Sequence, residues 1–227
     1  MALVSMDEEL LIAHAAGVLS APMRLLIETY AAIRDDVAVA LDVAEIAAVA
    51  FFESEPADAM ADDAVDVALA LVEAVESGAG EAAGLKSPTP AHVAQRAGTA
   101  LDELLDLPHP VRERALAAGG QWRFAAPGVR RIELSVEGGA KAELLRIEPG
   151  HGSPTHTHEG NEFTLVLAGA FADGINRYGR GDLCTAGAET THRPIAEPGE
   201  TCFALAVTDG SLKFTGALGA VQRLFGG

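Results

Sequence analysis

Hydrophobic residues are spaced differently in the two halves of the chain, and the change falls near residue 120. Before it, apolar side chains recur every three or four positions, which predicts amphipathic helices. The predicted helices cover residues 7–17, 22–34, 37–52, 58–77, 89–107 with a break near Gly98, and 111–118. The segment 37–52 is apolar nearly all round, so we expect it to be buried against several partners.

After residue 120, apolar and polar residues alternate in short runs bounded by Gly, Pro or Asp, which predicts strands. These runs cover residues 122–126, 129–134, 142–147, 163–167, 170–178, 182–186, 192–196, 201–207 and 212–215. Many short strands in succession predict an antiparallel sandwich or a closed barrel. A last apolar stretch, residues 217–225, predicts a short closing helix.

Residues 78–90 interrupt the helical half and are rich in glycine and proline, which is typical of an interdomain linker. We therefore predict a multidomain α+β protein. An N-terminal all-α helical bundle covers residues 1–80, and a linker with short helices covers 81–119. A C-terminal antiparallel β-barrel or sandwich covers 120–227.

The stretch between Gly150 and Gly169 carries the clearest candidate chemistry. His156 and His158 are two residues apart, so a strand places both imidazoles on one face. Glu162 begins the next apolar strand, and its carboxylate can converge on the two rings. His192, in the later segment Thr-His-Arg-Pro-Ile, is a candidate fourth ligand. These four residues predict a metal site.

The predicted ligands are imidazoles and a carboxylate, with no thiolate. That mixture suits a borderline divalent metal better than calcium or magnesium. We expect one ion, zinc first, with iron, manganese or nickel as alternatives. No further acid, base or arginine pair has a spacing that demands catalysis, so no catalytic residue is predicted. Arg177, Arg180 and Arg193 are expected at the surface.

Charge is distributed unevenly along this chain of net charge −17. Residues 1–107 hold 20 acidic and 4 basic residues, giving −16, and residues 108–227 hold 13 and 12, giving −1. An acidic surface repels nucleic-acid backbones, so we expect no direct nucleic-acid partner. It attracts a basic protein partner, although acidic residues also keep an alanine-rich helical domain in solution.

Several features predict a cytoplasmic protein without membrane contact. No apolar run reaches the roughly 18 residues that span a bilayer, and the N-terminus has no basic region or cleavage signal. Two cysteines fit a reducing compartment. Cys184 and Cys202 both fall in predicted strands, where we expect them to be small core residues.

The metal-site segment resembles the cupin family. Its first motif, G-x5-H-x-H-x3-E-x6-G, is met at every fixed position, from Gly150 to Gly169. In the second motif, G-x5-P-x-G-x2-H-x3-N, Gly181 and His192 fit. Gly187, Glu189 and Ala196 replace the framing residues, so the loop before His192 is expected to take a different path. The resemblance implies a small β-barrel around the metal.

The chain also resembles ChrR-type anti-sigma factors, in which a helical anti-sigma domain precedes a cupin. The resemblance rests on segments 10–30, 162–171 and 178–182. The family's helical domain carries a zinc motif, H-x3-C-x2-C, but here Tyr30, Arg34 and Val37 occupy those positions. The resemblance therefore implies a zinc-less version, held together by apolar contacts that include Tyr30 and Val37.

The resemblance implies a regulator that sequesters an extracytoplasmic-function (ECF) sigma factor through the helices and senses a signal through the cupin metal. Two alternatives stay open. One is a metal-dependent cupin enzyme, such as a dioxygenase or isomerase. The other is a metal-stabilised binding module whose helical half forms a homodimer. We expect the chain not to be an enzyme.

The remaining histidines give weaker signals. His14 is expected to be a satisfied core residue. His92 and His109 lie beside the prolines of the connector, where we expect exposure. His151 lies five residues before His156 on the loop that enters the site, and could support it.

Overall fold

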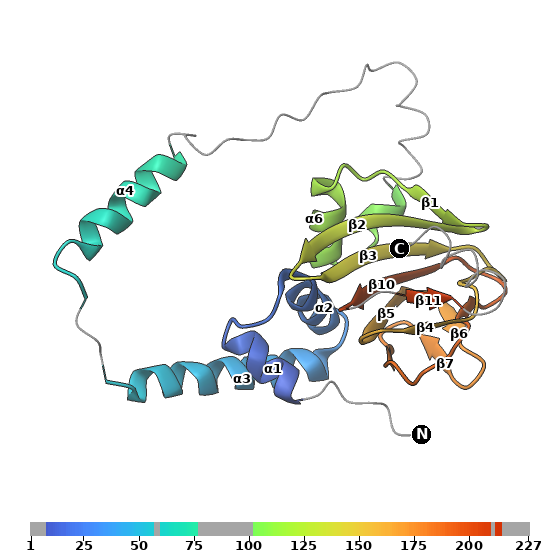
Figure 1. Cartoon of the computed structure of the whole chain (residues 1–227), viewed down its shortest axis with the longest axis horizontal. Helices are drawn as coiled ribbons and strands as arrows, with labels where there is room; N and C mark the ends of the chain where they lie inside the picture. Colours follow the sequence, from blue (N-terminus) through green and yellow to red (C-terminus); the bar gives the residue numbers. More distant parts are fainter. Residues whose placement is uncertain (1–7, 57–59, 77–101, 210–211, 215–227) are drawn as a thin grey trace, which may run out of the picture.

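The computed structural model describes residues 8–56, 60–76, 102–209 and 212–214 (Figure 1). The predicted linker 78–90 and the predicted closing helix 217–225 lie outside these residues. The helices are α1 (Glu8–Ala15), α2 (Ala21–Ala31), α3 (Asp35–Ser54), α4 (Ala64–Glu76) and α6 (His109–Ala117). The strands are β1 (Arg123–Ala126), β2 (Val129–Glu137), β3 (Ala140–Ile147), β4 (His156–His158), β5 (Glu162–Ala168), β6 (Ala170–Ala172), β7 (Arg177–Gly179), β8 (Leu183–Ala186), β9 (Ile195–Ala196), β10 (Cys202–Thr208) and β11 (Leu212–Phe214).

The strands form three antiparallel sheets. The largest has six strands in the order β1-β2-β3-β10-β5-β8, and the smaller sheets are β7-β6-β9 and β11-β4. The predicted closed barrel is therefore wrong for the described residues. Strands of two or three residues near the site are too short to continue the ladder, and isolated bridges replace it there.

Both faces of the six-stranded sheet are covered. The outer face presents residues such as Leu144, Leu165 and Leu205 to α2 and α6, in one continuous apolar core. On the inner face, Ile147 and Val166 share a second core with Phe171 of β6. The molecule is thus layered as helices, large sheet and small sheets. Because the helices cover the outer face of the large sheet, only side chains on its inner face can line a site.

Helix α2 lies against the large sheet as well as against α1 and α3. Leu25, Leu26 and Ile27 are buried, and they join the core that the sheet's outer face and α6 share. The predicted all-α bundle is therefore formed only in part: α1, α2 and α3 pack on one another, but their core continues into the sheet and into α6. Tyr30 and Val37 are buried as the resemblance implied.

The N-terminus of α2 shows how the two halves are joined. Ser20 precedes the helix and Pro22 lies in its first turn, but the Ser20 side chain makes no capping hydrogen bond. The carboxylate of Glu137, at the end of β2, accepts a hydrogen bond from the backbone N–H of Ala21 instead. An acid at this position also complements the helix dipole.

The long helix α3 and the separate helix α4 leave most of their apolar residues exposed. In α3 only Val37 and Leu41 are buried, both near its start. Ile46 is 69% exposed and Phe52 is 66% exposed. The predicted burial of α3 against several partners is wrong within the described chain, and α4 is likewise not packed on another described element.

No helix among the described residues is both long and apolar enough to cross a membrane.

Candidate metal centre

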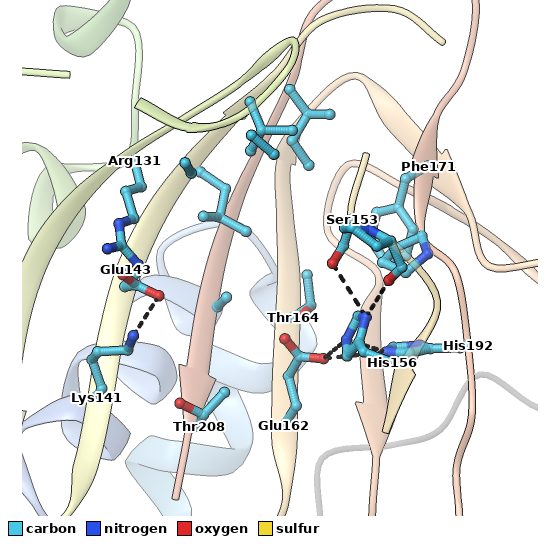
Figure 2. Close-up of a pocket in the computed structure, with 18 of the residues that line it drawn as sticks. Arg131, Lys141, Glu143, Ser153, His156, Glu162, Thr164, Phe171, His192 and Thr208 are labelled. Atoms are coloured by element: carbon cyan, nitrogen blue, oxygen red, sulfur yellow. Dashed lines mark hydrogen bonds and ion pairs between the residues drawn. The ribbon is translucent and has the colours of Figure 1, made fainter. Parts of the chain in front are cut away.

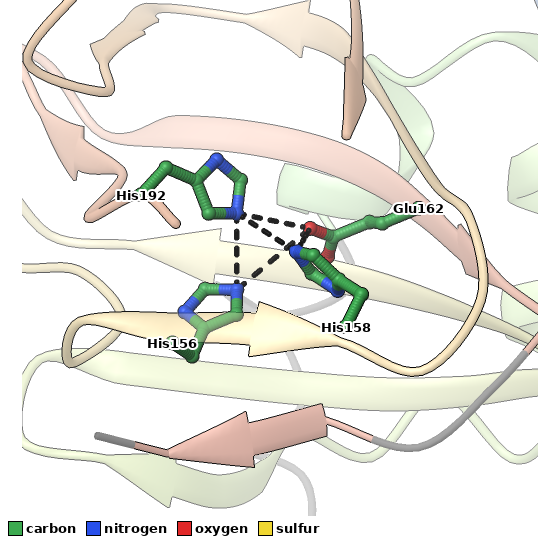
Figure 3. A group of neighbouring side chains, drawn as sticks. All are labelled: His156, His158, Glu162 and His192. Atoms are coloured by element: carbon green, nitrogen blue, oxygen red, sulfur yellow. Dashed lines mark hydrogen bonds and ion pairs between the residues drawn. The ribbon is translucent and has the colours of Figure 1, made fainter. Parts of the chain in front are cut away.

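The four predicted ligands come from neighbouring backbone segments. Strand β4 buries His156 and His158 on one face and leaves Thr157 between them on the other. Glu162 is the first residue of β5. His192 forms an isolated antiparallel bridge with His156. The side chains of all four therefore point into the space between the sheets (Figure 3).

The ligand atoms converge on one point. The Nε2 atom of His192 lies 3.1 Å from Nε2 of His156 and 3.1 Å from Nε2 of His158. The Oε2 atom of Glu162 lies 3.8, 3.3 and 3.4 Å from Nε2 of His156, His158 and His192. Side-chain exposure is only 2–3% for the histidines and 12% for the glutamate. This is a buried group of four donors that could hold a metal ion.

The spacing of these donors fits a small divalent ion. With bonds of about 2.0–2.1 Å, a tetrahedral zinc ion holds its ligand atoms about 3.3–3.4 Å apart. The measured separations lie around that value. The Nδ1 atoms of His158 and His192 are buried without a hydrogen-bond partner among the described residues. The polar contacts of these two rings therefore all lie within the cluster.

His156 is oriented by its other nitrogen. Its Nδ1 lies 2.8 Å from the carbonyl oxygen of Pro154 and 3.2 Å from the hydroxyl of Ser153. A carbonyl can only accept, so Nδ1 carries the proton and the lone pair of Nε2 faces the cluster. Metal-binding histidines are commonly held in this way. Ser153 and Pro154 were not predicted from the sequence, since a loop serine and a backbone carbonyl give no pattern.

Electrostatics favour an ionised carboxylate beside basic imidazoles. Burial raises the pKa of Glu162, but its interactions with the imidazoles of His156 and His192 outweigh burial and hold that pKa at about 2. Burial lowers the pKa of His156. The interaction with the Glu162 carboxylate and the hydrogen bond to the backbone carbonyl of Pro154 outweigh burial and raise this pKa above its ordinary value. Burial also lowers the pKa of His158, and here it prevails. Glu162 thus supplies the negative charge that a cation needs.

A second group shares one of these residues. Asp173, Cys184 and His192 each place one ligand-type atom within 4.8 Å of the others. Burial raises the pKa of the Cys184 thiol to about 11, so the thiol is protonated near neutral pH. The group of three histidines and a glutamate is the stronger candidate.

A cavity of about 1080 Å³ adjoins the cluster, and His156, Glu162 and His192 form part of its lining (Figure 2). Its volume is at the upper end of the roughly 300–1,000 Å³ typical of small-molecule sites. The sequence did not predict it.

The other candidate residues lie elsewhere. His14 is only 13% exposed and its Nε2 lies 3.9 Å from Oε1 of Glu28, but neither ring nitrogen has a hydrogen-bond partner among the described residues, so the expectation of a satisfied core histidine is wrong. His109 is exposed as predicted, 3.3 Å from Glu113. His151 is exposed, and its Nδ1 contacts the carbonyl of Pro149 rather than the cluster. Arg177 is exposed as predicted and pairs with Glu197. His92 lies outside the described residues.

The two cysteines are free and buried, which confirms their expected place in the core.

Comparison with known families defines the class of the C-terminal half. Residues 115–212 match the family described as "ChrR Cupin-like domain". The C-terminal half is therefore a cupin-like domain with a buried cluster of three histidines and a glutamate.

The whole chain has a curated relative. It is 30% identical over 219 residues to the Anti-sigma-E factor ChrR of Cereibacter sphaeroides, covering 96% of this chain and 95% of that protein. A crystal structure of Rhodobacter sphaeroides SigE in complex with the anti-sigma ChrR is also similar. The TM-score is 0.62 and the identity 32%, over 89% of this chain and 97% of that one. This chain belongs to the family of ChrR-type anti-sigma factors.

Proposed function

We propose that this protein is an anti-sigma factor that binds an ECF-type sigma factor and releases it when the state of the cupin site changes. The observation that carries the proposal is the end-to-end similarity to the Anti-sigma-E factor ChrR. The similar solved structure is of ChrR in complex with a sigma factor, and that activity is here transferred to this chain.

Helices α3 and α4 supply a surface suited to such a partner. Their exposed apolar residues are Val39, Val43, Ile46, Val49, Phe51, Phe52, Val65, Val67, Leu69, Leu71 and Val72. Contiguous apolar surface of this kind is typical of protein interfaces. The acidic excess of −16 in residues 1–107 favours a partner with basic surfaces. We place this action in the cytoplasm, on a sigma factor rather than on nucleic acid.

The cupin-like domain would carry the signal. We infer that His156, His158, Glu162 and His192 bind one zinc ion, because a buried set of three imidazoles and one carboxylate suits zinc. Iron, manganese and nickel remain alternatives to be distinguished by metal analysis. A bound ion would link β4, β5 and the segment around His192, and it would offset the repulsion between the lone pairs of the clustered imidazoles.

Strand β5 offers a physical connection between the two halves. Glu162 and Thr164 face the cavity, whereas Leu165 and Leu167 face the core shared with α2. A change at Glu162 can therefore shift residues that contact the helices. In domain terms we propose a sigma-binding unit over 1–80, a connector over 81–119 and a sensor over 120–227.

Co-purification with an ECF sigma factor encoded beside this protein tests the proposal. The expected product is a 1:1 complex on size-exclusion chromatography. Ile46→Asp and Phe52→Asp should each weaken it at least about tenfold, since burying an unpaired carboxylate in an interface costs more than about 1.4 kcal/mol. Ile175→Asp is the matched control, because Ile175 is 79% exposed and lies in the cupin-like half.

Failure of the wild-type chain to bind any sigma factor of that class would sink the proposal. An equal loss of binding in Ile175→Asp would show that the effect of the added charge is not local to α3.

A further inference from the structure

The cavity beside the histidine cluster lies over a part of the large sheet where the central strand, β10, carries small side chains. In the register of the sheet, Lys141 of β3, Thr208 of β10 and Glu162 of β5 form one row across three strands. The next row along the strands is Glu143, Ala206 and Thr164. Small residues on the central strand leave open space between the polar groups at the two sides.

The side of the cavity away from the cluster carries two cations. Arg131 Nη1 lies 2.8 Å from Glu143 Oε1, and Lys141 Nζ lies 2.9 Å from Glu143 Oε2 (Figure 2). Glu143 is the single acid paired with either cation in the described part of the chain. One carboxylate between two cations leaves a net charge of +1 and several N–H donors available to another anion.

Lys141 is separated from Glu162 by two strand spacings, about 9–10 Å between Cα atoms, and Arg131 lies on β2, one strand further away. A group bound at Arg131 and Lys141 therefore does not need to coordinate an ion held by the histidines. The two polar ends of the cavity are distinct sites for a ligand.

Much of the remaining wall is apolar, although Glu159, Thr164, Thr208 and Asp209 also line the cavity. Val129, Leu145, Ile147 and Phe171 line the cavity, and all except Leu145 are buried. An inorganic anion would satisfy the cations and leave this wall in contact with water. An anion with a hydrocarbon chain covers both, and burial of each methylene contributes about 0.8 kcal/mol.

We propose that this cavity binds an amphipathic organic acid of medium chain length. Its carboxylate pairs with Arg131 and Lys141, and its aliphatic chain lies against Val129, Leu145 and Ile147, beside the histidine cluster. The inference goes beyond sigma-factor binding and does not rest on it, because it concerns the cupin-like half alone. Ligand binding and complex formation are measured separately, so one can fail without the other.

Isothermal titration of the purified full-length chain with octanoate at neutral pH tests the proposal, and 1-octanol is the uncharged probe of matched length. We expect saturable binding of octanoate, at least about tenfold tighter than that of octanol, because charge-assisted hydrogen bonds contribute about 1.5–3 kcal/mol. Inorganic phosphate should compete weakly, since it makes no apolar contact.

Three variants locate the binding. The double variant R131Q/K141Q should weaken octanoate at least about tenfold and leave octanol within about twofold. The double variant leaves Glu143, whose side chain is only 14% exposed, without a cationic partner within the described chain. The triple variant R131Q/K141Q/E143Q also removes this charge, and it should show the same loss of octanoate affinity. R130Q is the matched control. Arg130 neighbours Arg131 on β2, but the alternation of the strand places it on the opposite face.

Absence of saturable octanoate binding by the wild-type chain overturns the proposal. It is also overturned if octanol binds as tightly as octanoate, or if R130Q loses as much affinity as the double variant. Retention of wild-type affinity by a folded triple variant, checked by thermal unfolding, excludes the cation pair as the binding site.

Discussion

His156 and His192 contact each other through both main chain and side chain. The backbone N–H of each residue donates to the carbonyl of the other at 3.1 Å, and their Nε2 atoms also lie 3.1 Å apart. A bridge between residues 36 positions apart in the sequence thus holds the two rings side by side. His158 and Glu162 then need only the geometry of β4 and β5 to complete the cluster.

Removal of one cluster ligand should remove the metal. We predict that His158→Ala lowers the zinc content of the purified protein at least about tenfold, since a structural site with three ligands left loses much of its affinity. Inductively coupled plasma mass spectrometry measures this content. His151→Ala is the control, because His151 is close in sequence but is exposed, with its Nδ1 against the carbonyl of Pro149. Equal metal content in both variants would contradict the assignment.

Acid should release the metal. Binding requires neutral imidazoles, and ordinary histidines protonate near pH 6.5. Because the pKa of His156 is raised, protons compete with the metal for this ring at a higher pH than for an ordinary histidine. Because the pKa of His158 is lowered, protons compete for that ring only at a lower pH. Stability contributed by the metal should be fully present above neutral pH and lost as the pH falls through about 6 to 5. Thermal unfolding with and without chelator across this range measures the difference, which should vanish at the acid end.

The shared core of α2 and the large sheet should dominate stability. Leu26 is fully buried there, so Leu26→Ala is predicted to cost about 2–5 kcal/mol in the free energy of unfolding. Ile46→Ala, on the exposed part of α3, should cost less than about 0.5 kcal/mol. Urea unfolding distinguishes the two. Similar costs would mean that α3 is buried in solution.

The two thiols should resist modification in the folded protein. Burial raises the pKa of Cys184 to about 11 and that of Cys202 to about 12, so little thiolate exists at pH 8. We expect iodoacetamide to label neither cysteine natively and both in urea. The pKa values of both thiols are higher in the folded than in the unfolded protein. Their contribution to the free energy of unfolding is therefore fully present below about pH 9, and it is lost as the pH rises through 11 to 12. C184A/C202A should therefore lose less stability than wild type over that alkaline range.

Some of these features could be predicted from the sequence. The strand pattern and the spacing of His156, His158 and Glu162 are local, so they survive any uncertainty about topology. His192 was predictable only through its resemblance to a motif, because the bridge that brings it beside His156 is a long-range contact.

Other features depend on packing that no local pattern encodes. The amphipathic pattern of α2 indicates a helix but does not say whether its apolar face meets other helices or a sheet. The row of Lys141, Thr208 and Glu162 exists only once the register of β3, β10 and β5 is known. Likewise, the apolar residues of α3 predict burial but not whether the buried surface is within this chain.

The exposed apolar length of α3 also sets a limit on how this protein can exist alone. A helix with Ile46 and Phe52 open to water favours self-association as concentration rises, and it offers proteases and chaperones a recognisable target. Self-association and degradation would then limit the cellular amount of the free chain. A partner protein that covers α3 would remove this limit. The cellular amounts of the two proteins would then be matched through degradation as well as through synthesis.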